Sequence, residues 1–85
     1  MITIKYTIKD PEGIHARPAG EMVKLLKAFA STITISKGEQ TVDAKRILGV
    51  MGLAAKQGQE IIMAVEGADE EKAAQEIELF LNEKM

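Results

Sequence analysis

His15 is the only histidine in the 85 residues, and it lies in the one stretch that could carry covalent chemistry, Gly13-Ile14-His15-Ala16-Arg17-Pro18. Imidazole is a nucleophile that is largely unprotonated at neutral pH, so it can attack phosphorus. Arg17 brings a fixed positive charge two residues further on, and a guanidinium can bind phosphate oxygens bidentately. These residue types predict phosphoryl transfer, with His15 as nucleophile and Arg17 as phosphate ligand.

The pattern around His15 predicts that a helix begins directly after it. Pro11-Glu12-Gly13 is a turn signature upstream. Downstream, an apolar stripe at helical spacing consists of Met22, Leu25, Leu26 and Phe29. Pro18 fits a first helical turn, where N–H groups have no intrahelical partner. The backbone amides of Ala16 and Arg17 would then be free to bind an anion at the positive end of the helix dipole.

Other uses of these residues have less support. A histidine at a loop-helix junction can be merely solvated or capping. With no second histidine and no cysteine, a metal site or a Cys-His pair is hard to build, and we expect no metal or cofactor. A Ser/His/Asp triad would need Ser31 or Ser36, and neither has the surroundings of a nucleophile elbow. Arg17 has no carboxylate within the motif, so we expect it to serve the phosphate.

Composition predicts one ordinary globular domain over residues 1–85, with 46% hydrophobic and 28% charged residues. The net charge of −2 gives no support to nucleic-acid binding or to an anionic membrane surface. The start of the chain alternates apolar and polar residues, unlike a signal peptide, and no run is long enough to span a membrane. Together with the absence of cysteine, these features predict a cytoplasmic protein.

Alternation of apolar and polar residues, together with one continuous apolar run, predicts four strands. Residues 2–9 have the period of a half-buried strand, and Ile33, Ile35 and Val42 flank the turn Lys37-Gly38-Glu39 of a hairpin. The stretch Ile61–Val65 is apolar on both faces, so we expect it to be central in the sheet.

Two further helices complete the predicted fold. One is short and spans Ile47 to Ala54; the other follows Asp69 as its N-cap and carries a stripe of Ala73, Ile77, Phe80 and Leu81. The order βαββαβα predicts an α+β open-faced sandwich, in which three helices cover one face of a four-stranded antiparallel sheet. Ferredoxin-like RNA-binding domains overlap this order, but they use aromatic residues on the open face of the sheet, and only Tyr6, Phe29 and Phe80 are available.

The stretch Gly13-Ile14-His15-Ala16-Arg17-Pro18-Ala19 resembles the active-site signature of the HPr family, the histidine-containing phosphocarriers of the phosphoenolpyruvate-dependent sugar phosphotransferase system. The block Ala44–Ala54 is similar to the second motif of that family, and the resemblance covers essentially the whole chain. It implies the open-faced sandwich, transient phosphorylation of His15 on Nδ1, and exchange of phosphate with enzyme I and enzyme IIA components. The chain would then be a phosphoryl carrier rather than a self-contained enzyme, and we expect a monomer.

The resemblance also implies a surface for these partners. Lysines usually lie on a solvated face, but here four cationic residues would join Arg17 as a basic rim: Lys24, Lys27, Lys45 and Arg46. An exposed apolar patch beside the histidine would consist of Ile47, Leu48 and Met51. Because a short helix needs an anchor in the core, we expect Ile47 or Val50 to point inward.

The sequence departs from the family at Arg46, where many members have a serine that caps the short helix and in some bacteria is phosphorylated by a dedicated kinase. Arginine can do neither, so we expect no such regulation. Gly52 and Ala54 depart more mildly from residues common in the family. The alternative to a carrier is a regulatory, HPr-like binding protein, but such a protein would need neither His15 nor Arg17.

Overall fold

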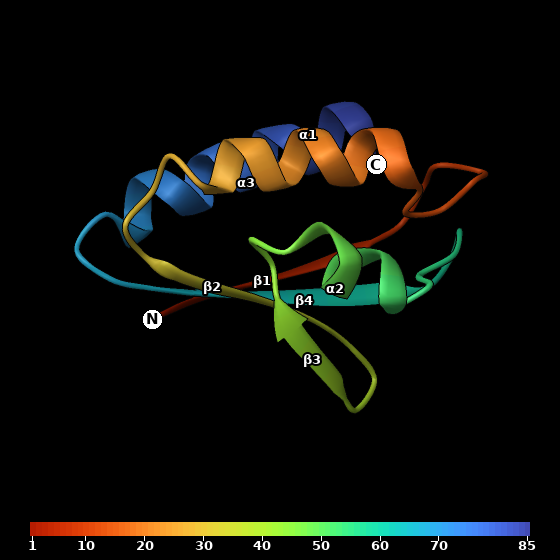
Figure 1. Ribbon diagram of the computed structural model, residues 1–85, viewed down its shortest axis with the longest axis horizontal. Helices are drawn as coiled ribbons and strands as arrows, with labels where there is room; N and C mark the ends of the chain where they lie inside the picture. Colours follow the sequence, from red (N-terminus) through yellow and green to blue (C-terminus); the bar gives the residue numbers. More distant parts are fainter.

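The computed structural model describes residues 1–85 and has the predicted order of elements. Four strands form one antiparallel sheet in the order β1-β4-β2-β3. The elements along the chain are β1 (Ile2–Thr7), α1 (Ala16–Leu26), β2 (Thr32–Lys37), β3 (Gln40–Asp43), α2 (Ile47–Gly52), β4 (Glu60–Glu66) and α3 (Glu70–Lys84). All three helices lie on the same face of the sheet (Figure 1). The open-faced sandwich predicted from the sequence is therefore confirmed.

β4 is a central strand, as its apolar composition predicted, because it pairs with β1 on one side and β2 on the other. Its residue Met63 lies opposite Ile4 in one neighbour and Ile35 in the other, and all three side chains are buried. Side chains alternate between the two faces of a sheet. The next row of residues therefore faces away from the helices, and it contains Thr3, Ala64 and Thr34.

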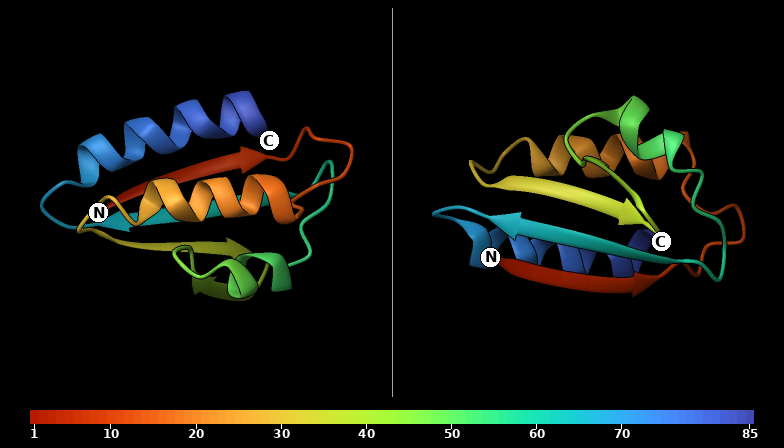
Figure 2. Two further views of the ribbon diagram at one scale, coloured as in Figure 1. Left: turned by 45° about the horizontal axis from the view of Figure 1, so that its top comes forward. Right: turned by 90° about the horizontal axis from the view of Figure 1, so that it is seen from below.

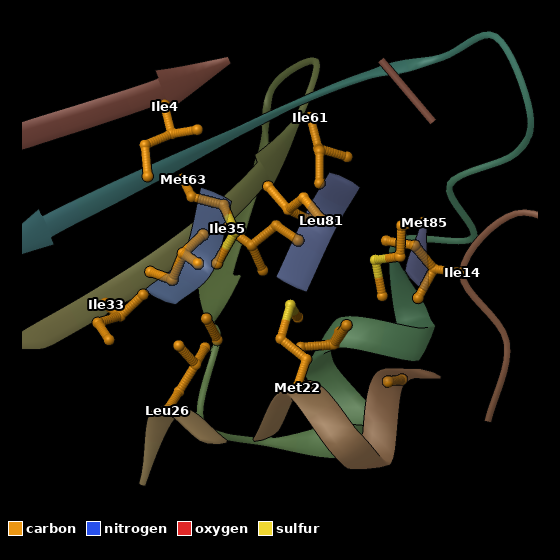
Figure 3. Packing of buried hydrophobic residues seen from close by; sticks show 14 of the residues in the cluster. Ile4, Ile14, Met22, Leu26, Ile33, Ile35, Ile61, Met63, Leu81 and Met85 are labelled. Atoms are coloured by element: carbon orange, nitrogen blue, oxygen red, sulfur yellow. The ribbon is translucent and has the colours of Figure 1, made fainter. Parts of the chain in front are cut away.

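The core fills the space between the sheet and the helices (Figure 3). α1 contributes Met22 and Leu26, and α3 contributes Ile77 and Leu81, each no more than 1% exposed. The aromatic residues Tyr6, Phe29 and Phe80 pack against this core. They do not provide an aromatic surface on the open face of the sheet, so the RNA-binding alternative lacks its stacking platform.

α1 and α3 lie side by side and run in opposite directions along the sheet (Figure 2). α3 consequently ends beside the loop that joins β1 to α1, where the amides of Lys9 and Asp10 donate to the main-chain oxygen of Met85 at 2.7 and 3.0 Å. None of the helices has both the length and the apolar character needed to cross a lipid bilayer.

Asp69 precedes α3 as predicted, but its side chain does not cap the helix. The carboxylate instead accepts hydrogen bonds from the amides of Ala30 and Ser31, at 2.8 and 3.0 Å, and from the Ser31 hydroxyl. Hydrogen bonds to the ionised form, above all the one from the hydroxyl, lower the pKa of Asp69. Asp69 is therefore the N-cap residue by position, as predicted. Its side chain makes no capping hydrogen bond because the carboxylate faces the segment between α1 and β2, where Ser31 lies 38 residues away in sequence.

α1 ends at Leu26, earlier than the expected end near Phe29. The amides of Ala28 and Phe29 donate three residues back, to Leu25 and Leu26 oxygens, so the last turn is tighter than an α-helix. α2 likewise ends at Gly52, before the predicted Ala54. Such differences at helix ends leave the positions of the candidate site residues unchanged.

Candidate functional site

A tight turn delivers His15 to the start of α1. The Gly13 amide donates to the Asp10 oxygen at 2.9 Å, which closes a turn with Pro11 at its second position. Gly13 has φ +68°, and a Cβ there would collide with the Ala55 carbonyl. That same carbonyl accepts the Ile14 amide at 2.9 Å. Only glycine therefore fits this close approach, which fixes the loop before the histidine.

His15 is the N-cap residue of α1, with extended backbone at φ −121° and ψ 176°. Its side chain makes no capping hydrogen bond, so the imidazole is not used to close the helix. The first helical hydrogen bond runs from the Ala19 amide to the His15 oxygen at 3.0 Å. Since Pro18 has no N–H and the first amides of a helix have no intrahelical acceptor, the amides of Ala16 and Arg17 are free to bind an anion. The structure thus has the predicted helix start directly after His15, while phosphate binding by these amides stays a prediction.

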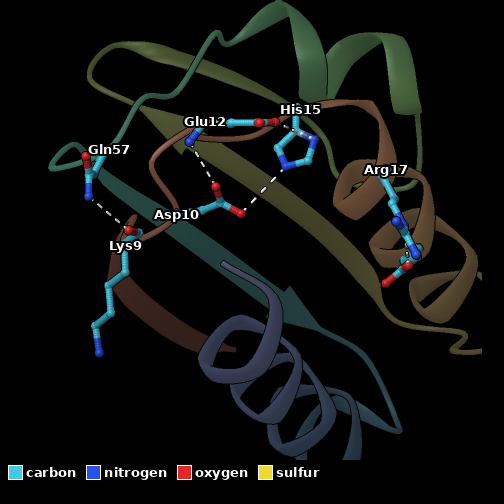
Figure 4. A network of polar contacts seen from close by, with 7 residues as sticks. Lys9, Asp10, Glu12, His15, Arg17 and Gln57 are labelled. Atoms are coloured by element: carbon cyan, nitrogen blue, oxygen red, sulfur yellow. Dashed lines mark hydrogen bonds and ion pairs between the residues drawn. The ribbon is translucent and has the colours of Figure 1, made fainter.

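Two carboxylates flank the imidazole (Figure 4). Glu12 Oε2 lies 3.5 Å from His15 Nδ1, and Asp10 Oδ2 lies 3.6 Å from Nε2. Both separations exceed ordinary hydrogen-bond length but allow direct electrostatic contact. Sequence reasoning treated residues 11–13 only as a turn and missed both contacts. The available signal was two acidic residues on a turn that folds back toward the histidine.

Arg17 projects into solvent, with 87% of its side chain exposed. The motif itself offers Arg17 no carboxylate, as the sequence indicated, but Arg17 Nε lies 3.9 Å from Oε1 of Glu21, which is one helical turn along and outside the motif. Exposed pairs of this kind contribute little to stability, so Arg17 remains available to a phosphate.

A shallow hollow of about 190 Å³ lies next to the ring. Its lining consists of Asp10, His15, Arg17, Pro18, Glu21 and Lys84. Lys84 belongs to the last turn of α3, and its Nζ lies 3.7 Å from Glu21 Oε2. The end of α3 thus adds the ammonium group of Lys84 to the site, beside His15 and Arg17. The sequence alone did not assign Lys84 to the site.

The predicted apolar patch is exposed on α2. Leu48 is 83% exposed, while Ile47 and Met51 are 38% and 37% exposed. Val50 is the residue of this helix that points inward and is fully buried. A Cβ on Gly20 would lie 3.5 Å from Ile47 Cδ1, so the patch adjoins α1 about one turn after the site.

The four predicted rim cations differ in their surroundings. Lys24 is exposed on α1, and Lys27 is exposed at its C-cap. Lys45 is half-buried, and its Nζ donates to the Phe29 carbonyl at 2.7 Å. A cation near the carboxyl end of a helix is favourable, and Phe29 lies just after α1. The ammonium group of Lys45 is therefore engaged by the segment that follows α1 and is not free on the rim. Arg46 is 81% exposed, with its Nε 3.8 Å from Asp43 Oδ2.

The fold and the site together define a small α+β domain whose single histidine lies at the start of a helix, beside main-chain amides that have no intrahelical acceptor. A family model described as the HPr component phosphorylation site of the phosphotransferase system matches residues 2–83. The phosphocarrier protein HPr of Lysinibacillus sphaericus is 46% identical over 83 residues, which cover 98% of this chain and 94% of that relative. The chain therefore belongs to the HPr family.

A solved structure and a second relative agree with this assignment. The histidine-containing phosphocarrier protein of Mycoplasma superposes with a TM-score of 0.93 at 35% identity, covering 96% of this chain and 93% of that one. The HPr-like protein Crh of Bacillus subtilis is 31% identical over 85 residues, 100% of both chains. Because Crh is named an HPr-like protein, this likeness keeps the regulatory alternative open beside the carrier.

Proposed function

We propose that this protein is a phosphocarrier of the sugar phosphotransferase system, which accepts a phosphoryl group in the cytoplasm from phosphorylated enzyme I on His15 and passes it to enzyme IIA components. The observation that carries the proposal is the placement of His15 beside the free amides of Ala16 and Arg17 at the start of α1. A regulatory binding protein would not need a nucleophile aligned with an anion-binding site.

In the proposed transfer, the lone pair of Nδ1 attacks phosphorus and forms the N–P bond. The bond between phosphorus and the donor's nitrogen or oxygen breaks, and its electron pair stays with the donor. The amides of Ala16 and Arg17 and the Arg17 guanidinium then stabilise the charge on the phosphoryl oxygens. The same contacts serve the reverse attack by an acceptor, because they stabilise the same charge on the phosphoryl oxygens.

The partner surface in this proposal combines the exposed patch with the nearby cations. Leu48, Ile47 and Met51 supply apolar area that a partner can cover. Lys24, Lys27 and Arg46 supply exposed positive charge that steers an acidic partner toward the site. Lys45 has a weaker part in docking, because its ammonium group is engaged by the Phe29 carbonyl.

Incubation with enzyme I and phosphoenolpyruvate, followed by intact-mass analysis, tests the proposal. The wild-type protein should gain one phosphoryl group that is labile in acid and stable in alkali, as expected for phosphohistidine. His15→Ala should gain none, because the chain has no other histidine. Phosphoenolpyruvate-dependent phosphate on His15→Ala would overturn the assignment of the nucleophile, and an unmodified wild type would overturn the carrier function.

A regulatory role is the second candidate, and the relative that favours it is Crh, which is named an HPr-like protein. One solved structure of Crh is described as a domain-swapped dimer. We expect this chain to be a monomer. We also expect no serine-dependent regulation, because Arg46 occupies the position that would be modified. A solved HPr structure is also described as a dimer, so oligomeric state does not separate the two candidates. Phosphoryl transfer to an enzyme IIA component does, because a purely regulatory protein would not pass the group on.

A further inference from the structure

Asp10 and Glu12 contact opposite nitrogens of the same imidazole. Asp10 Oδ2 lies 3.6 Å from Nε2 and Glu12 Oε2 lies 3.5 Å from Nδ1 (Figure 4). Neither residue has a part in the function proposed above. Their placement matters to that function, because a neutral imidazole has one nitrogen that carries the proton and one that carries the reactive lone pair.

The two carboxylates are held to very different degrees. Asp10 is 26% exposed, and its Oδ1 accepts the Glu12 amide at 2.9 Å. Its main-chain oxygen also accepts the Gly13 amide, so both ends of the residue belong to the turn. Glu12 is 73% exposed, and its carboxylate accepts no hydrogen bond from any other residue. Asp10 is thus a fixed neighbour of the ring, while Glu12 can move away.

Each carboxylate favours a proton on the nitrogen that it faces. A proton on Nε2 is stabilised by Asp10 and leaves the lone pair on Nδ1. A proton on Nδ1 is stabilised by Glu12 and removes that lone pair. Glu12 also occupies the space beside Nδ1 that an entering phosphoryl group needs, and its negative charge repels such a group.

We propose that Asp10 is a positioning residue that keeps Nδ1 of His15 reactive, and that Glu12 is a mobile restraint that must leave Nδ1 before a phosphoryl group can enter. The inference rests on the proposed function, since it takes Nδ1 as the phosphorylated atom. An incoming group that is accompanied by positive charge, from a partner or from Arg17, draws Glu12 away. Without such a group, Glu12 slows modification of the histidine by small anions.

The proton position can be measured directly, because the single histidine gives unambiguous signals. Long-range ¹H–¹⁵N correlation spectra of the neutral imidazole distinguish a protonated nitrogen from one with a lone pair. Glu12→Gln should increase the form with the proton on Nε2, and Asp10→Asn should increase the form with the proton on Nδ1. Asparagine can still accept the Glu12 amide through Oδ1, so the turn should survive. Glu66→Gln, at the opposite end of β4, is the matched control for charge.

Reactivity can be measured without any protein partner by using phosphoramidate. Nδ1 forms the new N–P bond, the P–N bond of phosphoramidate breaks with its electron pair going to nitrogen, and ammonia leaves. Intact-mass analysis should show that Glu12→Gln is modified about fivefold faster than wild type, the factor expected for one charge about 4 Å away in water. Asp10→Asn should be modified more slowly, and Glu66→Gln should match wild type within about twofold, as expected for a screened distant charge.

Unchanged proton positions and unchanged rates in both Asp10→Asn and Glu12→Gln would overturn the inference, as would shifts of both variants in the same direction. The outcome is separable from the proposed function because phosphoramidate does not involve enzyme I. A wild-type protein that phosphoramidate modifies, and enzyme I does not, would contradict the carrier function while leaving the opposed effects of the two carboxylates measurable.

Discussion

Arg17 is joined to Glu21 across one turn of α1, with Nε 3.9 Å from Oε1, although 87% of the Arg17 side chain is exposed. Both residues line the hollow beside His15, and the contact leaves the guanidinium exposed. An exposed pair at this spacing stabilises a helix by about 0.3–0.5 kcal/mol. The contribution of Arg17 to folding is therefore small, and its main effect should be on transfer.

Arg17→Ala should slow phosphoryl transfer from enzyme I by at least about tenfold, equal to about 1.4 kcal/mol of transition-state stabilisation. The free energy of unfolding should change by less than about 0.5 kcal/mol, as for other exposed substitutions. Rapid-quench transfer kinetics and urea unfolding measure the two effects. Glu21→Gln is the matched control, because it removes the partner and leaves the guanidinium. Near-normal transfer by Arg17→Ala would remove this residue from the mechanism.

Leu48 is the most exposed large apolar residue, at 83%, and its side chain has no evident use inside the fold. Leu48→Ala should weaken binding of enzyme I by about fivefold to tenfold, the loss of one apolar contact of about 1 kcal/mol. Stability should be unchanged. Leu79→Ala, on the exposed side of α3, is the control because that residue is 58% exposed and belongs to another surface. Equal losses for both variants in calorimetric titrations would argue against a docking role for α2.

The carboxylate of Asp69 should make the free energy of unfolding depend on pH in the acidic range. Because hydrogen bonds, first of all from the Ser31 hydroxyl, lower its pKa in the folded state, it stabilises the fold above the ordinary aspartate pKa of about 3.9. This stabilisation is lost as the pH falls through the lowered folded value. Asp69→Asn should be less stable than wild type at pH 7, and the difference should disappear in strong acid.

Urea unfolding at a series of pH values from neutral to strongly acidic measures that difference. Glu66→Gln is the control, because it removes an exposed carboxylate that accepts no hydrogen bond. The difference in free energy of unfolding between this variant and wild type should not change with pH. A gap between wild type and Asp69→Asn that stays constant with pH would show that the carboxylate charge is not what stabilises the contact with Ser31.

Ala54 has φ +52°, a left-handed conformation that costs an alanine about 1–2 kcal/mol. Replacement by glycine relieves this strain. It also makes the unfolded chain more flexible, which lowers the free energy of unfolding by about 0.4–1 kcal/mol. Ala54→Gly should therefore stabilise the protein by about 0.5–1 kcal/mol, the difference of these terms. Ala68→Gly, at an exposed turn position without positive φ, should instead destabilise it. Equal effects in thermal and urea unfolding would contradict strain at Ala54.

Most of the architecture could be predicted because it depends on local periodicity. Alternation identified β1 and the hairpin, and the apolar run Ile61–Val65 identified the central strand, since a strand with neighbours on both sides is well covered. The start of α1 followed from Pro18, whose missing N–H is tolerated only in the first turn. His15 and Arg17 were identified by residue type together with that helix start.

The polar contacts could not be predicted, because they join segments that only the folded chain brings together. Lys45 reaches Phe29 across 16 residues and Asp69 reaches Ser31 across 38. Neither pair has a spacing that a helix or strand would mark. Asp10 and Glu12 are close to His15 in sequence, but whether a carboxylate faces the ring depends on how the turn closes, which Gly13 and Ala55 determine together.

Arg46 stands where the resemblance to the family implies a capping serine, and the structure shows the backbone that such a serine would have. It is the N-cap of α2, with extended backbone at φ −117° and ψ 113° and no side-chain hydrogen bond to the helix. Serine in this backbone conformation could accept an amide of the first turn. Arg46→Ser should therefore stabilise the protein by about 0.5–1 kcal/mol in urea unfolding.

The charge of Arg46 should act on association rather than on folding, because 81% of the side chain is exposed and its pairing with Asp43 is weak. Arg46→Asp could also cap α2, so any loss of association would come from reversed charge. We expect slower association with enzyme I at low salt and a smaller deficit at high salt, since exposed charges more than about 10 Å apart are screened at 0.1 M. Stopped-flow association of wild type, Arg46→Ser and Arg46→Asp at two ionic strengths measures this. Equal rates at low salt would place Arg46 outside the docking surface, and the cation would then be a neutral replacement at an unused regulatory position.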